Sequence, residues 1–414
     1  MTQRSSYSGT WLTRAVAFVA LAVVASSCRK PPQGAGGPYG DVIAKAVPAV
    51  EKAVGLSFKT PPRIEVRSKE QVRAFVLKQL ADSNNMREIA GQSGVYKLLG
   101  MIPDTLDLSA LMTRLLQEQI VGFYDPETKV LYIVQGSPKE STELIVTHEL
   151  VHALQDQYVN LDSIQKVSTD NDRQTAAQAV FEGQAVYEQV HAMLGPGNIA
   201  VGLPAGWERV RESIRNNQAA MPVYASAPMV VQETLLFPYL SGAEFVKNFR
   251  AREPGKIPFQ DLPTSTAQIL HPNEFFGKRV QPTRVSFGPV AGITPTYEND
   301  LGEFETRLFL YQHLNSIDDA AAAATGWNGD RYIAFTTPSG PAVAWASVWL
   351  TPAQGAAFYS AMQRVIDARR PAEHGRSMRV TTGEIGGRAV VLFVDTPAGV
   401  TTPVTIRDVI LGGR

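Results

Sequence analysis

Apolar positions along the first third of the chain follow two spacings, and each spacing predicts a different kind of element. Residues 63–66 alternate in the manner of a short strand, and a β-branched run over residues 130–134 follows a Tyr-Asp-Pro turn, which predicts a hairpin. The strand at 130–134 leads within a few residues into a helix predicted over residues 142–158. Helical spacing, with an apolar side chain every three or four positions, also occupies residues 43–54, 68–80 and 106–121.

The pattern changes from mostly helical to mixed in the last third of the chain. Helices are predicted over residues 173–194, 205–220 and 240–252, whereas residues 263–282 have the composition of a loop. The remaining elements are predicted in the order helix 301–324, strands 331–336 and 343–350, helix 352–369, and strands 378–382 and 388–394. This succession predicts an α+β fold without internal repeats.

The first 28 residues have the pattern of an export signal. Arg4 and Arg14 precede an unbroken apolar run of 11 residues that ends at Ala25, and Ser-Ser-Cys28 follows. The run is shorter than the roughly 20 residues that a membrane-spanning helix needs. Residues 1–27 are therefore predicted to be a signal peptide, and the Pro- and Gly-rich residues 28–40 a flexible tether.

The ending Ala-Ser-Ser-Cys28 resembles the lipobox of bacterial lipoproteins, in which the cysteine is lipidated. The resemblance implies an exported protein, anchored through Cys28 to the outer face of the cell membrane or to the periplasmic side of the outer membrane. The alternative is an ordinary cleaved signal peptide beside which Cys28 is incidental.

Composition narrows the classes of function. The chain has 39 Lys and Arg against 39 Asp and Glu, so its charge offers no reason to expect nucleic acid as a partner. Its single cysteine excludes an intramolecular disulfide and a cysteine-rich zinc site. A metal site in this chain would have to use histidines and carboxylates.

His148-Glu149-Leu-Val-His152 is an H-E-x-x-H sequence within the helix predicted over residues 142–158. His148 and His152 are four residues apart, so they lie one turn apart on one helix face and can bind one metal ion. Glu149 is offset by about 100° and can deprotonate a water held there. The alternative is a chance match, which the residue frequencies put on the order of one in a hundred.

Two imidazoles with an oxygen ligand suit zinc, and a catalytic zinc ion has three protein ligands and one open position. Glu182 is the favoured third ligand, because a carboxylate among Ala, Val and Phe is costly to bury without a cation. Gly183 beside it predicts close packing of two helices. Three alternatives for the third ligand remain: Glu188, His191 and Asp156.

THELVHALQDQ, followed thirty residues after His152 by Glu182-Gly183, resembles the gluzincin-type zinc metallopeptidases. The closer resemblance is to uncharacterised bacterial secreted or lipid-anchored members of that group, and it extends from about residue 100 to residue 335. The segments that carry it further are EQIVGFYDPETKVLYIV, LLFPYLSGAEFV, PTSTAQILHPNEF and GWNGDRY.

The resemblance implies a zincin-like catalytic region over residues 41–285, with an N-terminal α/β part (41–140) and a part (141–285) that holds the active-site helix and Glu182. A C-terminal α+β domain would follow over residues 286–414. In a zincin, a small mixed sheet lies over the active-site helix, and its edge strand binds substrate backbone. The strand with Val130, Tyr132 and Val134 is the candidate for that edge.

One position departs from the thermolysin-like pattern, which has an Asp four residues after the ligand Glu to orient a ligand histidine. This chain has Val186 there, so Asp156 or a backbone carbonyl is the candidate for that role. His271 and Tyr239 are candidates for stabilising the oxyanion, and a structural role is as well supported for each. The other histidines, His191, His313 and His374, are interpreted as packing or surface residues.

The sequence thus predicts a membrane-anchored zinc metallopeptidase that acts on a peptide or protein substrate. One Zn2+ ion would be bound by His148, His152 and Glu182, and Glu149 would act as general base. The alternatives are a catalytically silent zincin-shaped scaffold lipoprotein and a zinc amidase acting on cell-wall peptides. The sequence does not determine the oligomeric state, the cleavage specificity or the role of the C-terminal domain.

Overall fold

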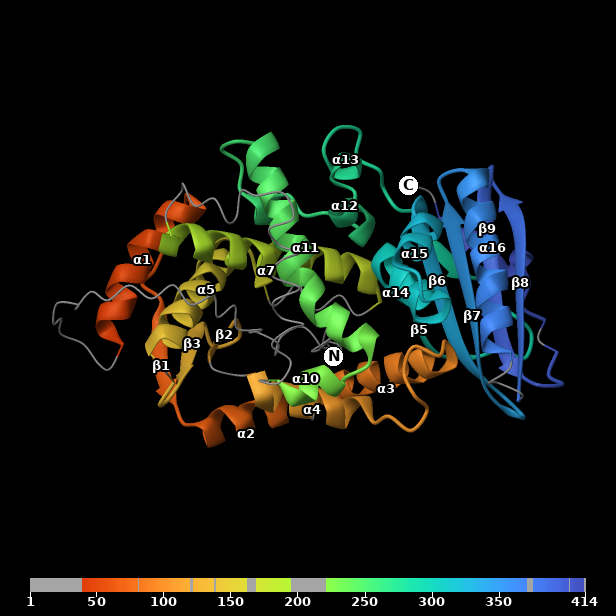
Figure 1. Ribbon diagram of the computed structural model, residues 1–414, viewed down its shortest axis with the longest axis horizontal. Coiled ribbons are helices and arrows are strands. Elements are labelled where there is room, and N and C mark those ends of the chain that lie inside the picture. The colour runs from red at the N-terminus through yellow and green to blue at the C-terminus, as the bar shows by residue number, and fades with distance from the viewer. Residues whose placement is uncertain are drawn as a thin grey trace, which may run out of the picture.

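A computed structural model describes residues 39–80, 82–119, 122–137, 139–161, 169–194, 221–370, 375–401 and 403–412. The predicted signal peptide, Cys28, most of the tether, the helix at 205–220 and His374 lie outside these ranges. The described chain is a mixed α and β structure, with a small sheet among helices at one end and a five-stranded sheet at the other (Figure 1). None of the described helices is both long enough and apolar enough to span a membrane.

The small sheet has the strand order β1-β3-β2. Strand β2 (Gly122–Asp125) and β3 (Val130–Val134) form the predicted antiparallel hairpin, while β1 (Arg63–Arg67) pairs with β3 in parallel. The prediction that residues 130–134 form the edge strand is therefore wrong, because β1 occupies the other side of β3. The mostly buried run of β3 suits a central strand, and β2 is the edge strand beside helix α5.

Four helices belong to the N-terminal part of the chain: α1 (Gly40–Val54), α2 (Lys69–Leu80), α3 (Ser83–Leu98) and α4 (Leu108–Gln119). The helix predicted over residues 142–158 is confirmed as α5 (Lys139–Tyr158), which packs against β2 and β3. Helix α7 (Asn171–Leu194) packs against α5 on one side and against α11 (Met229–Arg252) on another. Helix α11 begins 11 residues before the helix predicted over residues 240–252, because the helix is not broken at Pro238.

The predicted close packing at Gly183 is confirmed. A Cβ atom on Gly183 would lie 2.1 Å from the carbonyl carbon of Gly242 on α11, and one on Gly242 would lie 1.9 Å from the oxygen of Ala179. Two glycines thus allow the backbones of α7 and α11 to touch. The loop predicted over residues 263–282 contains two short helices, α12 (Thr266–Leu270) and α13 (Pro272–Phe275), and η3 (Pro258–Gln260) precedes it.

The C-terminal sheet is antiparallel, with the order β5-β6-β7-β9-β8. Its strands are β5 (Pro295–Asn299), β6 (Trp327–Thr337), β7 (Gly340–Trp349), β8 (Arg376–Ile385) and β9 (Arg388–Pro397). Helices α14 (Gly302–Leu314), α15 (Ile317–Ala324) and α16 (Pro352–Arg369) pack together beside it. The other sheet face is packed by a β-ribbon of β4 (Val285–Phe287) and β10 (Val409–Leu411), next to η4 (Ile406–Asp408).

The single helix predicted over residues 301–324 is two helices in the structure. Asn315 has a φ of 52°, a left-handed conformation that ends α14, and the side chain of Ser316 then caps α15. Asn tolerates this conformation better than most residues, and Ser is a preferred helix cap. Two local signals thus outweigh the continuous apolar pattern.

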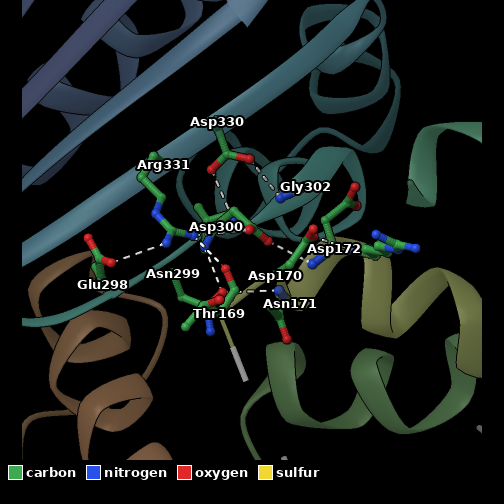
Figure 2. A network of polar contacts seen from close by, with 12 residues as sticks. Thr169, Asp170, Asn171, Asp172, Glu298, Asn299, Asp300, Gly302, Asp330 and Arg331 are labelled. Carbon is green, nitrogen blue, oxygen red and sulfur yellow. Dashed lines mark hydrogen bonds and ion pairs between the residues drawn. The ribbon is translucent and has the colours of Figure 1, made fainter. Parts of the chain in front are cut away.

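A buried polar network joins the start of α7 to the C-terminal sheet (Figure 2). The backbone N–H of Asp172 donates to Oδ1 of Asp300 over 2.7 Å, and the side chain of Asp330 accepts from the backbone N–H groups of Leu301 and Gly302. Arg331 on β6 donates to the backbone carbonyl of Thr169 over 2.6 Å. Helix α7 therefore contacts both α5 and the C-terminal part of the chain.

Candidate metal centre

The structure brings together the three ligands that the sequence predicts. Nε2 of His148, Nε2 of His152 and Oε2 of Glu182 lie 3.2 Å from one another in each pairing. His148 and His152 occupy successive turns of α5, and Glu182 faces them from α7. Among the described residues, these three form a group whose spacing suits a metal ion. Tetrahedral ligands about 2.1 Å from a metal would lie about 3.4 Å apart, so the spacing fits.

The electrostatics of the cluster favour a positive charge between its members. Burial lowers the pKa of His152, but Glu182, with smaller contributions from Glu149 and Gln155, raises the pKa to about 9. Burial raises the pKa of Glu182, whereas His152 and His148 lower it to about 2. Without a metal ion, the cluster therefore holds a proton at neutral pH. A divalent cation could take the place of that proton.

Glu149 lies beside the ligands and is nearly inaccessible to solvent. Its Oε2 accepts a hydrogen bond of 2.8 Å from the backbone N–H of Tyr124 on the edge strand β2. Its Oε1 is buried and accepts no hydrogen bond from any residue that the structure describes. Burial raises the pKa of Glu149, while His152 and His148 lower it. One oxygen is thus held in place, and the other retains its capacity to accept a proton.

The residue that orients His152 is Gln155, which sequence reasoning missed. Nδ1 of His152 lies 2.9 Å from Oε1 of Gln155, whose Nε2 donates to the backbone carbonyl of Phe181 over 3.2 Å. This carbonyl can only accept, so it fixes the amide with its oxygen toward the ring. Nδ1 must then carry a hydrogen, which leaves Nε2, facing Glu182, as the nitrogen that could bind a metal ion once its own proton is displaced. The available signal was a Gln three residues after the second histidine, on the same helix face.

The prediction that Asp156 orients a ligand histidine is wrong. Oδ2 of Asp156 accepts from the hydroxyl of Tyr124 over 2.7 Å and from Nζ of Lys129 over 2.6 Å. Asp156 therefore attaches the β2–β3 hairpin to α5. The same hairpin holds Glu149 through Tyr124, so Asp156 supports the site indirectly.

The structure separates the two candidates for stabilising an oxyanion. Tyr239 on α11 stacks on His148, with ring centroids 6.1 Å apart, and its hydroxyl is hydrogen-bonded to Glu182. Burial raises the pKa of Tyr239 well above its usual value, and the carboxylates of Glu182 and Glu149 raise it further. His271 instead lies 2.7 Å from Oε1 of Glu303 and 3.0 Å from Arg307, both on α14. Tyr239 belongs to the site, whereas His271 belongs to the contact between α12 and α14.

The alternative third ligands all have other partners. Glu188 forms a buried ion pair with Arg250 on α11, and burial raises its pKa to about 7 although Arg250 lowers it. The ring of His191 packs against Tyr187, with centroids 4.4 Å apart.

His313, which the sequence offers as a packing or surface residue, lies 2.8 Å from the backbone carbonyl of Leu99.

The residues proposed for a substrate edge do not form one. Val130 and Val134 are buried in the central strand β3. Tyr132 packs on Phe123 and lies under the guanidinium group of Arg67. The edge strand along α5 is β2, and the backbone N–H of its Tyr124 donates to Glu149 directly.

Comparison with known families gives a match for one part of the chain. A family model described as a domain of unknown function (DUF8575) matches residues 292–404. The match covers the C-terminal five-stranded sheet and lies within the domain predicted over residues 286–414. No curated protein and no solved structure matches the chain.

Proposed function

We propose that the protein is a zinc-dependent hydrolase with a zincin-like catalytic region, and that it acts as a peptidase. The observation that carries the proposal is the convergence of His148, His152 and Glu182 beside a buried Glu149 with one unpartnered oxygen. Two imidazole nitrogens and one carboxylate oxygen form a set that zinc prefers, with a fourth position left for water or substrate.

His148, His152 and Glu182 would hold the ion, which when bound would polarise a substrate carbonyl and acidify water. Glu149 would take a proton from the attacking water on Oε1 and later deliver it to the leaving amine. Tyr124 would keep that carboxylate oriented through its backbone N–H. The hydroxyl of Tyr239 would leave Glu182 and donate to the carbonyl oxygen as negative charge develops there.

The decisive experiment combines metal content with turnover of a broad peptide library. We expect about one zinc per chain, and we expect Glu149→Gln to retain zinc while lowering turnover by roughly 10²-fold or more. Glu182→Gln should lower both the zinc content and the turnover. Glu143→Gln, at a partly exposed position on the same helix, is the matched control and should alter neither property.

The outcomes separate the parts of the proposal. Zinc bound at full occupancy without turnover of any peptide would contradict the peptidase and favour a scaffold. Turnover confined to cell-wall peptides would favour the amidase. Absence of zinc from protein purified without chelators and incubated with the ion would contradict the metal centre itself.

Anchoring to a membrane through Cys28 is part of the proposal, although Cys28 lies outside the described residues. Mass spectrometry of the mature N-terminus should find an acylated cysteine. An unmodified N-terminus that begins at another residue would contradict the anchor.

A further inference from the structure

A cleft of about 940 Å³ lies between helix α3 and the C-terminal sheet. Its walls include Gly94 and Lys97 of α3, Tyr297 of β5 and Phe335 of β6, and Arg376 at the start of β8 also lines it. Figure 1 shows α3 extending to the side of the sheet where β5 lies. No residue of the candidate metal centre lines the cleft. Its volume is in the range of sites that bind small ligands or short peptide segments.

The lining carries an excess of positive charge. The lining includes three cationic side chains, those of Arg87, Lys97 and Arg376, and one carboxylate, that of Asp104. Arg87 and Lys97 form no ion pair with any residue in the described part of the chain. Such an excess favours an anionic ligand.

Arg376, the first residue of β8, adds to this excess of positive charge in the lining. Its Nε donates to Oδ1 of the buried Asp395 over 2.8 Å, and the other oxygen of Asp395 accepts from Arg369 over 3.2 Å. Asp395 therefore accepts from both Arg376 and Arg369. Nη1 of Arg376 donates to the backbone carbonyl of Pro341 over 2.9 Å, and the buried Nη2 makes no hydrogen bond with any described residue, so Arg376 contributes its charge to the cleft.

The spacing of the cations selects an extended ligand. Arg87 and Lys97 are ten residues apart on one helix, which places them about 15 Å apart along its axis. One phosphate or carboxylate cannot contact both. A chain of about six extended residues can, because each residue advances about 3.3 Å. Between the two cations, α3 contributes the exposed Ala90 and Gly94 to the wall, and Ala334 of β6 lines it from the sheet.

Gly91 and Gly94 lie on the same face of α3, and packing accounts for the first but not for the second. A Cβ on Gly91 would lie 2.3 Å from the ring of Tyr297, so packing requires a glycine there. A Cβ on Gly94 would meet no atom within 4 Å. Glycine weakens a helix interior, and no contact of the described chain accounts for Gly94. Its missing side chain keeps the middle of the cleft open for a ligand to approach the helix.

We propose that this cleft binds an extended peptide segment of about six residues, with an acidic group at each end and apolar residues between them. One acidic end would lie at Arg87, and the other at Lys97 and Arg376. The apolar middle would lie over Gly94, against Ala90 and Ala334. This site is separate from the proposed hydrolase and does not depend on it.

The test measures fluorescence anisotropy with the full chain carrying Glu149→Gln, so that the probe is not hydrolysed if the proposed function is correct. The probe is a labelled hexapeptide with an aspartate at each end and Leu and Ala between them. The comparison peptide has asparagine at both ends, and inorganic phosphate is the competitor. We expect the acidic peptide to bind at least about tenfold more tightly than its asparagine counterpart, and less tightly as salt is raised.

Variants locate the binding. Arg87→Gln with Lys97→Gln should weaken binding about tenfold, whereas Arg73→Gln, at an exposed position on α2, should not. Gly94→Leu should abolish binding while raising the melting temperature, because Leu favours the helix. A folded Gly94→Leu variant that binds normally would contradict the proposal. Equal binding of the asparagine peptide, full displacement by phosphate at constant ionic strength, or no binding would also overturn it.

Discussion

At the scale of single residues, the amide of Gln155 decides which nitrogen of His152 can bind a metal ion. Replacing Gln155 with leucine removes the acceptor for Nδ1 and leaves the carbonyl of Phe181 without its donor. We expect Gln155→Leu to weaken zinc binding about 10- to 100-fold, because partners of ligand histidines typically contribute that much. Competition with a chelator of known affinity measures this.

Two variants make the test specific. Gln155→Glu retains an acceptor for Nδ1 and should keep more of the affinity than Gln155→Leu. Gln157→Leu, two residues further along α5, removes contacts to Lys59 and Thr60 and should leave zinc affinity unchanged. Equal affinities of Gln155→Leu and the parent would contradict the assigned role.

The pKa values of His152 and Glu182 predict a pH dependence of metal binding. Since the pKa of His152 is raised to about 9 in the metal-free protein, a metal ion must displace a proton at any pH below that value. The pKa of Glu182, about 2, keeps its carboxylate ionised over the same range. The apparent affinity should therefore fall about tenfold for each unit that the pH falls between 8 and 6.

Calorimetry in buffers of different ionisation enthalpy measures this coupling. The expected result at pH 7 is release of about one proton from the protein for each metal ion bound. An affinity that stays constant between pH 6 and 8 would show that His152 is already neutral in the metal-free protein.

At the scale of elements, the contact between α7 and α11 positions Glu182. Gly183→Ala would place a methyl group against the backbone of Gly242, which neither helix can accommodate without moving. We expect a loss of about 1–3 kcal/mol in the free energy of unfolding, the usual cost of overpacking. Zinc affinity should fall too, because the movement displaces the neighbouring Glu182. Urea denaturation and metal titration measure the two effects.

Gly94→Ala is the matched control, since it makes the same substitution within a helix where the added methyl group meets nothing. It should raise the free energy of unfolding by about 0.5–1 kcal/mol. If Gly183→Ala and Gly94→Ala changed the free energy of unfolding in the same direction, the distinction between a packed and an open glycine would be wrong.

At the scale of the whole molecule, the polar network of Figure 2 couples α7 to the C-terminal domain and makes stability depend on pH. Burial raises the pKa of Asp172 well above its usual 3.8, the hydrogen bonds from Thr266 lower it, and Asp330 raises it further. Folding therefore takes up a proton above pH 3.8. The stability that depends on this proton is complete below that pH and is lost as the pH rises through the raised pKa.

Asp172→Asn should flatten this dependence. Asparagine is neutral at every pH and still offers Oδ1 to the backbone N–H of Thr266. The slope of unfolding free energy against pH should change by up to about 1.4 kcal/mol per unit. Urea denaturation between pH 4 and 8 measures it, with Asp367→Asn, an exposed carboxylate on α16, as control. Parallel curves for the parent and Asp172→Asn would show that Asp172 is ionised in the folded protein.

The sequence by itself determined the features that depend on neighbouring residues. The spacing of His148 and His152 places them on one helix face whatever surrounds the helix, and the apolar setting of Glu182 and Gly183 predicted a buried carboxylate next to a helix contact. The hairpin of β2 and β3 was predictable because its turn is local.

Only the tertiary structure decided the partners that lie far apart along the chain. The pairing of β1 with β3 joins residues more than sixty positions apart, and it moved β3 from the edge of the sheet to its centre. Gln155 and Asp156 are adjacent and both polar, and only the positions of Phe181 and Lys129 decide which of them orients His152. The cleft beside α3 likewise exists only because that helix packs on a distant sheet. Helical spacing is a property of the local backbone, whereas these partners follow from how the elements pack together.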